Sequence, residues 1–292
     1  MGQIVFLNGA YIAAEDAKIS IFDRGLLFAD SVYEGFGILD GQILDFAYHM
    51  QRLARSLDQL NIPAPMRDDE MLAMLMRLVR DNAAEAGFLY LQITRGEGGR
   101  NYTYDDSYVP NVMAFVQTDR VTPVDAPKLL SMKSVPDLRW ARRDIKTTNL
   151  LGQVMAKQAA HEAGASEALM VDDAGMVTEA GSSSFFFIKD KVLYVRPVTN
   201  EILHGITRQT MLRVAEQHQV RIEEKYYTLE EALAADEAFI TAASIFVAPV
   251  IKIDDTVIAD GEMGPITALL REAYIEIARR EFPDLSEIDS AL

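Results

Sequence analysis

Hydrophobic and polar residues follow two different periods along this chain, and together they predict a mixed α and β protein. Short runs of β-branched and aromatic residues between turn formers are typical of strands. Such runs occur at residues 4–8, 11–13, 19–22, 31–39, 89–94, 112–116, 129–134, 168–171, 184–188, 238–242 and 247–253. Asn8-Gly9 is typical of a hairpin turn between the first two runs, whereas Asp23-Arg24-Gly25 is expected to interrupt the strand pattern.

Five longer segments repeat apolar residues every three or four positions, which is the period of an amphipathic helix. The first has apolar residues at positions 46, 50, 53, 57 and 60 and is stopped by Pro63. Gly87 and Gly164 follow two of these segments and are expected to cap their C-terminal ends. The predicted helices span residues 46–60, 68–86, 151–162, 206–218 and 266–281.

Two prolines and several polar residues at 118–127 indicate a boundary between two domains. We therefore expect two α+β domains, at residues 1–118 and 128–292, joined by a linker at 119–127. A length of 292 residues is enough for two domains. The predicted fold class is α+β, with a cleft between the domains, and such clefts commonly hold small ligands.

Charge and composition exclude several classes of function. The chain has 28 Lys and Arg against 44 Asp and Glu, a net charge of −16, which disfavours binding to nucleic acid or to an anionic membrane surface. It has no cysteine, so disulfides, thiolate nucleophiles and cysteine metal sites are excluded. Its four histidines do not occur at metal-ligand spacings, and no metal site is expected. We expect a soluble, cytoplasmic protein.

Two segments have the residue types that an active site needs. Lys146 follows Arg142 and Arg143, and neighbouring cations would disfavour its ammonium form, as an amine nucleophile requires; a surface lysine is the alternative. The backbone N–H groups of Ile206 and Thr207 would open a helix and could bind a phosphate, although an ordinary helix start has the same pattern.

Two further motifs favour loops. The glycine run at 96–99 does not open onto a helix pattern, so it predicts a flexible loop that brings Arg100 to a ligand. The serines at 182–184 lack a suitably placed histidine and favour a polar loop before a strand.

Five segments in order resemble the fold-type IV pyridoxal-phosphate transaminases, the class that holds the D-amino-acid and branched-chain enzymes. The resemblance covers nearly the whole chain and implies an α+β fold. This fold has a small N-terminal α/β domain, a larger C-terminal domain with a barrel-like sheet, and the cofactor between them. The segments are Asp30-Ser31-Val32-Tyr33-Glu34, His49-Met50-Gln51-Arg52-Leu53, residues 144–151 (DIKTTNLL), residues 177–184 (VTEAGSSS) and His204-Gly205-Ile206-Thr207-Arg208.

The resemblance implies catalytic roles for three residues. Lys146 would form the Schiff base with pyridoxal 5'-phosphate and then move the proton between the substrate Cα and the cofactor. Glu179 would keep the pyridine nitrogen protonated, and Tyr33 would line the substrate pocket. A non-catalytic binding protein of this fold would need neither Lys146 nor Glu179.

Other residues would hold the cofactor. Arg52 would pair with its phosphate together with the N–H groups of Ile206 and Thr207, and Leu203 would pack on one face of its ring. A second phosphate loop is expected at 242–244, where hydroxyls are common in relatives. This chain has Ala243 there, which could bind only through its backbone, and Ser244 is the remaining hydroxyl.

The loop after residue 95 bears on the substrate. D-amino-acid transaminases hold the substrate carboxylate with an Arg-x-His pair; here Arg100 fits the arginine, but Tyr102 stands in place of the histidine. A phenol lacks the imidazolium charge, so carboxylate binding is expected to be weaker or rearranged. Gly35 is nearer the branched-chain enzymes and would open space beside the substrate.

The expected reaction moves the amino group from a D-amino acid such as D-alanine to a 2-oxo acid such as 2-oxoglutarate. The alternatives are a branched-chain L-amino-acid aminotransferase, an (R)-amine transaminase and an aminodeoxychorismate lyase. The resemblance also implies a homodimer in which loops of one subunit reach the site of the other.

Overall fold

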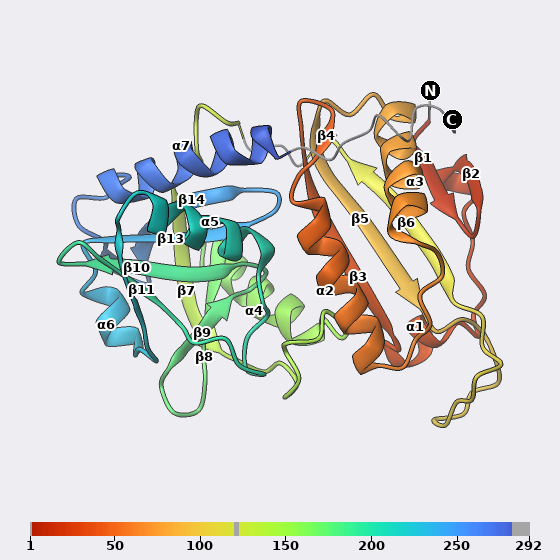
Figure 1. Cartoon of the computed structure of the whole chain (residues 1–292). Coiled ribbons are helices and arrows are strands. Elements are labelled where there is room, and N and C mark those ends of the chain that lie inside the picture. Colours follow the sequence, from red (N-terminus) through yellow and green to blue (C-terminus); the bar gives the residue numbers. More distant parts are fainter. Residues whose placement is uncertain (1, 120–122, 282–292) are drawn as a thin grey trace. The chain divides into compact units, whose positions relative to one another are not determined.

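The computed structural model describes residues 2–119 and 123–281 (Figure 1). Residues 120–122 of the predicted linker and 282–292 of the predicted C-terminal domain lie outside the described residues. The chain forms two compact units, of which unit 1 comprises Met1–Val121, Ile145–Asn149 and Arg279–Leu292, and unit 2 comprises Thr122–Asp144 and Leu150–Ala278. Ile145–Asn149, which was expected in the C-terminal domain, therefore belongs to unit 1.

Unit 1 is built on an antiparallel sheet of six strands in the order β2-β1-β6-β5-β3-β4. Helices α2 and α3 cover one face of this sheet (Figure 1). Its strands are β1 (Ile4–Leu7), β2 (Ala10–Ala13), β3 (Ser31–Leu39), β4 (Gln42–Ile43), β5 (Ala86–Thr94) and β6 (Asn111–Gln117). Its helices are the 3₁₀ turn η1 (Ala14–Asp16), α1 (Arg24–Phe28), α2 (Phe46–Gln59) and α3 (Asp68–Asp81).

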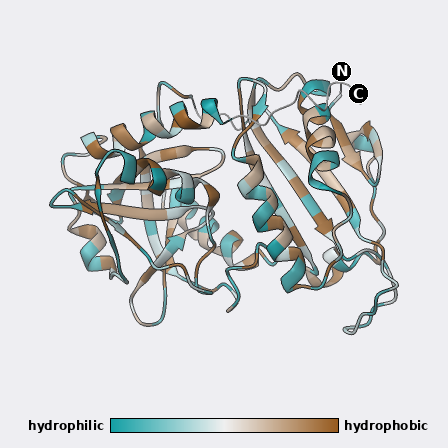
Figure 2. Ribbon diagram, viewed as in Figure 1, coloured by the Kyte–Doolittle hydropathy of each residue, from teal (hydrophilic) through white to brown (hydrophobic). Residues whose placement is uncertain are grey.

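The two faces of this sheet are used differently. Alternate residues of each strand point to the same face, and one set packs under α2 and α3 to form the core of unit 1. That set includes Val32 and Phe36 of β3 and Leu89 and Leu91 of β5. Figure 2 shows hydrophobic residues along these strands and hydrophilic ones on the visible side of α2.

The other face has a ladder of aromatic rings. Tyr33 stacks on Tyr90 with ring centroids 5.4 Å apart, and Tyr90 stacks on Phe115 at 5.0 Å. Because Tyr33 is one residue from a core position, its side chain lies on the face that the two helices leave uncovered.

Unit 2 is built on a mixed sheet of nine strands, β12-β11-β10-β13-β14-β7-β8-β9, with β15 paired to β14. The strands are β7 (Leu130–Pro136), β8 (Glu167–Val171), β9 (Val177–Ala180), β10 (Ser184–Lys189), β11 (Val192–Val195), β12 (Arg221–Glu224), β13 (Glu237–Ala242), β14 (Phe246–Ile253) and β15 (Thr256–Val257). The helices are α4 (Leu151–Glu162), α5 (Ile206–Gln217), α6 (Leu229–Leu233) and α7 (Pro265–Arg280).

The sheet of unit 2 curls, because β9, at one end of the strand order, also contacts β10. Apolar side chains from six of the strands (β7, β8, β9, β10, β13 and β14) meet in one core cluster. Helix α4 packs on β7 and β8, and α5 packs on β13. The expected α+β class, with a barrel-like sheet in the second half of the chain, is confirmed. Within the described part of the chain, no helix is both long and apolar enough to cross a membrane.

Most of the predicted helices and strands are present, but a strand and the end of a helix were predicted wrongly. The strand expected at residues 19–22 is absent, because Asp23 accepts a hydrogen bond from the Leu26 N–H and starts helix α1 where a break was expected. Helix α3 ends at Asp81 rather than at residue 86, because Asn82 turns back to the Leu78 carbonyl and the next residue, Ala83, has a positive φ of 47°.

Gly87 is consequently not a helix cap. It lies in β5 with φ +156°, and a Cβ there would be 2.6 Å from the Gln117 carbonyl oxygen of the neighbouring strand. Gly164 does follow α4, with φ +74° and its N–H bonded to the His161 carbonyl.

The expectation that Gly35 opens space beside the substrate is also wrong. A Cβ at this position would lie 2.4 Å from Cζ of Phe88, so the Phe88 ring already occupies the space next to Gly35. The glycine instead permits the close approach of this ring from the neighbouring strand.

Replacing Gly35 by alanine is expected to lower the free energy of unfolding by about 1–2 kcal/mol, since the Phe88 ring must shift to make room. Urea denaturation measures this change. In a Phe88→Ala background the same substitution should cost much less, and an equal cost in both backgrounds would contradict the explanation. Gly99→Ala is the control, because a Cβ there meets no atom within 4 Å.

Candidate functional site

The free edge of strand β3 binds the segment that contains Lys146. Strand β4 pairs only with the far end of β3, so the beginning of β3 has an unpaired edge. The segment 145–149 fills it: the Tyr33 N–H donates to the Lys146 carbonyl (2.9 Å) and Thr147 forms an antiparallel bridge with Val32. The Lys146 Nζ then lies 4.2 Å from the centre of the Tyr33 ring. The structure thus brings together two of the three residues expected to be catalytic.

The cations expected to activate Lys146 are both paired with carboxylates of unit 2. Arg142 bonds Asp144 at 2.9 Å, and the Nε of Arg143 lies 3.6 Å from Asp137. The charges of these two arginines are therefore largely offset by the carboxylates beside them.

Arg52 is held by a carboxylate that the sequence analysis did not assign. Its Nε and Nη2 donate to the two oxygens of Glu34 at 2.9 and 2.7 Å, and Glu34 also bonds Nδ1 of His49 at 2.7 Å. Burial alone would raise the pKa of Glu34, but the charge and hydrogen bonds of Arg52 lower it well below its usual range. Burial lowers the pKa of His49 despite the nearby carboxylate, so His49 is a neutral donor. Glu34 stands between apolar residues of a predicted strand, and a carboxylate at such a position needs a buried cation as partner. This feature of the sequence could have predicted the pairing with Arg52.

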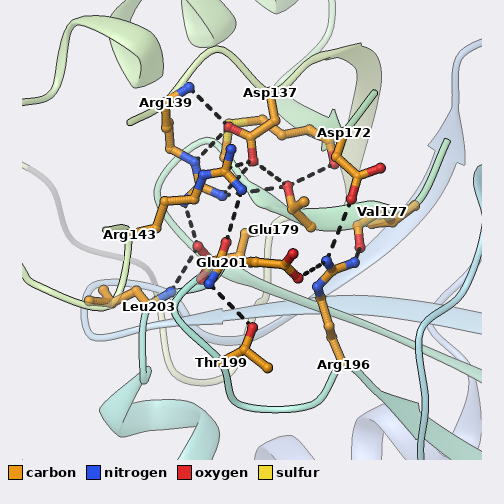
Figure 3. Close-up of polar contacts among 12 residues, drawn as sticks. Asp137, Arg139, Arg143, Asp172, Val177, Glu179, Arg196, Thr199, Glu201 and Leu203 are labelled. Carbon is orange, nitrogen blue, oxygen red and sulfur yellow. Dashed lines mark hydrogen bonds and ion pairs between the residues drawn. The ribbon is translucent and has the colours of Figure 1, made fainter. Parts of the chain in front are cut away.

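Glu179 of β9 lies at the centre of a buried cluster in unit 2 (Figure 3). Its Oε2 accepts hydrogen bonds from Nη1 of Arg139 and, at 3.0 Å, from the N–H of Leu203. Burial raises the pKa of Glu179, and the charge and hydrogen bond of Arg139 act against this shift. Leu203, which was expected to pack on the cofactor ring, is thus joined to Glu179 by its backbone.

Arg139 is in turn held by a second carboxylate. Its Nε and Nη2 donate to the two oxygens of Asp137 at 2.9 and 2.8 Å, and the Thr178 hydroxyl donates to Asp137 at 2.6 Å (Figure 3). The sequence analysis missed both Arg139 and Asp137. The chain therefore fixes the orientation of Glu179 through an arginine whose position is itself set by a carboxylate.

The N-terminus of α5 has the geometry of an anion-binding site. Its N-cap residue, Gly205, provides no side-chain acceptor, so the first N–H groups of this twelve-residue helix lack helical partners. Ile206 and Thr207 are both buried in this first turn. A Cβ at Gly205 would lie 2.7 Å from the Ser184 hydroxyl oxygen, so Ser184 is directly beside the helix start.

One buried hydroxyl next to this helix start has no partner within the described chain. Thr241 is directly opposite Ser184 in the pairing of β10 with β13, so the two side chains share a face of the sheet. Thr241 is 3% exposed, and its Oγ1 makes no hydrogen bond with the described residues. An unpaired buried hydroxyl beside free helix N–H groups fits an anion such as phosphate.

The loop expected to be a second phosphate site is a tight turn between β13 and β14. The Ile245 N–H donates to the Ala242 carbonyl at 3.2 Å, and Phe246 has φ +61°. Ala243 and Ser244 occupy this turn and are partly exposed. Their roles toward a cofactor stay predictions.

Arg100 and Tyr102 lie in the exposed loop between β5 and β6. Tyr102 is 75% exposed. Its hydroxyl lies 3.5 Å from Nη2 of Arg100, and both side chains lie beside Phe28 of α1, at 5.4 Å for Tyr102 and 5.7 Å for Arg100. The two residues thus form a pair on the surface of unit 1.

The chain matches the family model "Amino-transferase class IV" over residues 31–253. The chain belongs to the class IV aminotransferases. It is 36% identical over 271 residues to the D-alanine aminotransferase of Staphylococcus epidermidis, covering 92% of this chain and 96% of the relative. It is 38% identical over 269 residues to the D-alanine aminotransferase of Bacillus licheniformis, with 92% and 95% covered.

Two solved class IV aminotransferase structures have the same fold. A branched-chain amino acid aminotransferase of Escherichia coli matches with a TM-score of 0.89 at 24% identity, covering 97% of both chains. A second branched-chain amino acid aminotransferase, solved with pyridoxamine 5'-phosphate, matches with a TM-score of 0.88 at 26% identity, covering 96% of both chains. Class IV aminotransferases depend on pyridoxal 5'-phosphate (PLP). A buried carboxylate, a lysine amine and a helix N-terminus with buried hydroxyls are the groups that such a cofactor requires, so the residues present fit it.

Stability at low pH should depend on Asp137. Burial alone would raise the pKa of this carboxyl, but hydrogen bonds and charge from Arg139, with help from Thr178 and Arg143, lower it to about 2, against an ordinary value of 3.8. A depressed pKa stabilises the fold above the ordinary value, and this stabilisation is lost as the pH falls toward 2.

Between pH 5 and pH 3 this group should therefore contribute a loss of about 1 kcal/mol in unfolding free energy. Asp137→Asn should lower stability at both pH values but remove this part of the pH dependence, as measured by urea denaturation. An unchanged pH dependence would contradict the assignment. Asp236→Asn, at an exposed pair with Lys189, is the control for losing a surface carboxylate.

Proposed function

We propose that this class IV aminotransferase transfers the amino group of a D-amino acid such as D-alanine to a 2-oxo acid such as 2-oxoglutarate. The observation that carries the proposal is the 36–38% identity to D-alanine aminotransferases over 92% of the chain. The match to the class IV family model spans residues 31–253, where Lys146 and Glu179 lie.

PLP, when bound, supplies an electron-poor ring that absorbs the electron pair left when the substrate loses its Cα proton. Lys146 is the residue to which we assign covalent attachment of PLP and the movement of that proton through its Nζ. Its position over the Tyr33 ring supports this role, because Tyr33 packs against the lysine and limits the space in which the amine moves. Tyr33 would also line the substrate pocket.

Glu179 would hold the proton on the pyridine nitrogen. Both of its observed hydrogen bonds are made by Oε2, which leaves Oε1 to accept from the ring N–H. Burial raises the pKa of Glu179 because a negative charge is costly there, so a further hydrogen-bond donor at Oε1 would stabilise the charged carboxylate. Leu203, whose N–H bonds the same carboxylate, would pack on the ring.

The phosphate would be bound by the N–H groups of Ile206 and Thr207 and by the Thr207 hydroxyl. The free helix N-terminus supports this assignment. Arg52 would add a positive charge, in an orientation that Glu34 holds. Ser244 and the backbone of Ala243 would complete the group of donors.

We further propose that the protein acts as a homodimer, in which Arg100 and Tyr102 hold the carboxylate of a substrate bound to the other subunit. Their exposure on the surface of unit 1 supports this, because exposed aromatic and arginine side chains are enriched at interfaces. Large hydrophobic side chains are also exposed on α1 and the loops next to it, namely Ile21, Phe22, Leu26 and Val109.

A branched-chain L-amino acid is the second candidate substrate. The solved structure that matches at 26% identity with a TM-score of 0.88 is a branched-chain enzyme, and Tyr102 departs from the expected histidine. The absorption spectrum of the PLP-bound protein distinguishes the two during separate additions of D-alanine and L-leucine. A change with D-alanine alone supports the proposal, whereas a change with L-leucine alone overturns it in favour of the second candidate.

Lys146→Ala is expected to abolish turnover with D-alanine, by at least about 10²–10⁴-fold, because no other amine would move the proton. Borohydride reduction should attach PLP covalently to the original protein but not to this variant, as mass spectrometry would detect. Lys189→Ala is the matched control, since Lys189 is an exposed lysine paired with Asp236. Normal turnover of the Lys146→Ala variant would remove Lys146 from the reaction.

Arg100→Ala is expected to raise the KM for D-alanine by about tenfold or more, because a charge-assisted contact to the carboxylate is lost. The response to (R)-1-phenylethylamine, which has no carboxylate, should change less than about twofold. Steady-state kinetics with both donors measure the difference, with Arg77→Ala on the exposed side of α3 as control. Equal effects on both donors would show that Arg100 does not bind the carboxylate.

A further inference from the structure

The backbone of the loop that contains Arg100 and Tyr102 is bonded to one buried arginine. Arg24, the first residue of α1, is 3% exposed. Its Nη1 donates to the carbonyls of Asn101 (2.6 Å) and Thr103 (3.5 Å), and its Nη2 donates to the carbonyl of Tyr102 (3.4 Å). One guanidinium therefore holds three consecutive carbonyl groups of this loop.

Arg24 is itself rigidly placed. Its Nε donates to Asp30 at 2.7 Å, and its backbone N–H donates to the Gly96 carbonyl at 2.9 Å. The preceding residue, Asp23, caps α1 and also accepts hydrogen bonds from Thr94 (2.6 Å) and Asn111 (2.8 Å), at the end of β5 and the start of β6. Arg24 is thus anchored to both strands between which the loop runs.

Because the carbonyls of residues 101–103 are bonded to Arg24, the loop exposes side chains rather than these backbone groups. Arg24 holds the backbone of residues 101–103, whereas the side chains of Arg100 and Tyr102 are exposed. The Phe28 ring packs beside the Arg24 guanidinium at 4.9 Å and beside the exposed pair at 5.4–5.7 Å. The guanidinium and this ring together fix the spacing of Arg100 and Tyr102.

We propose that Arg24 is a positioning residue for substrate-carboxylate recognition, which holds the loop in the conformation that presents Arg100 and Tyr102 as a pair. The proposal rests on the proposed function, in which that pair binds the carboxylate. Lysine cannot replace Arg24, because a single ammonium group cannot bond Asp30 and three carbonyls at once, as the planar fork of an arginine does.

A purely structural role for Arg24 would be to neutralise the carboxylate of Asp30. Arg95 does this from another direction, with bonds to Asp30 at 2.8 and 3.0 Å, and its remaining bonds go to the carbonyls of Leu60 and Asn61 at the end of α2. Arg95 is buried to the same degree, at 3% exposure. Arg95→Lys is therefore a control that perturbs the same carboxylate without changing a hydrogen bond to residues 101–103. Its guanidinium also packs on the Tyr104 ring at 3.5 Å, so residue 104 is left out of the comparison.

The experiment compares the Arg24→Lys and Arg95→Lys variants of the PLP-bound full-length protein. Hydrogen exchange followed by mass spectrometry should show at least about tenfold faster exchange for amides of residues 99–103 in Arg24→Lys and no such change in Arg95→Lys. The KM for D-alanine should rise about tenfold in Arg24→Lys, with kcat changed less than about threefold. The response to (R)-1-phenylethylamine should change less than about twofold.

The two readouts separate failure of this inference from failure of the proposed function. Unchanged loop exchange in Arg24→Lys would overturn the inference whatever the substrate is. Faster exchange with equal effects on D-alanine and the amine would also overturn it, because the loop would then be held for a reason other than carboxylate recognition. If the unaltered protein does not react with D-alanine, the proposed function fails, and the exchange result still decides whether Arg24 holds the loop.

Discussion

A carboxylate buried in a protein costs several kcal/mol unless a cation and well-formed hydrogen bonds compensate it. Two fully buried carboxylates and one partly buried carboxylate each hold an arginine in this protein. Glu34 orients Arg52, Asp30 orients Arg24, and Asp137 orients Arg139. In each pair the carboxylate fixes the orientation of the guanidinium group. The remaining N–H groups of the arginine therefore point in a defined direction. Rigid side chains at the site are thus a consequence of charge burial.

The same constraint links stability to chemistry. Arg139 is compensated by Asp137 and also bonds Glu179, the carboxylate to which we assign the contact with the ring nitrogen of PLP. A carboxylate with only one partner would either take up a proton or turn toward solvent. This protein therefore keeps Glu179 buried and oriented at the expense of a second buried carboxylate, Asp137.

Sequence reasoning predicted the periodic elements well and their ends less well. Helices at 46–59 and 151–162 follow apolar periods that burial on one face requires, and strand 31–39 has the same bounds in the structure. The end of α3 depends on the Asn82 side chain and on a positive φ at Ala83. The spacing of apolar residues along the chain does not predict either feature. Gly35 and Gly87 were misread because their role depends on what lies across the sheet, Phe88 and Gln117.

The sequence by itself determined the family, the PLP dependence and the candidate residues, because motifs such as residues 144–151 keep the chemistry in adjacent positions of the chain. Only the tertiary structure decided which groups hold those residues. Arg24 is 77 residues from Asn101, and Arg139 is 40 residues from Glu179. Hydrogen bonds between such distant positions form only when strands pair and side chains are buried together, and no local pattern encodes that pairing.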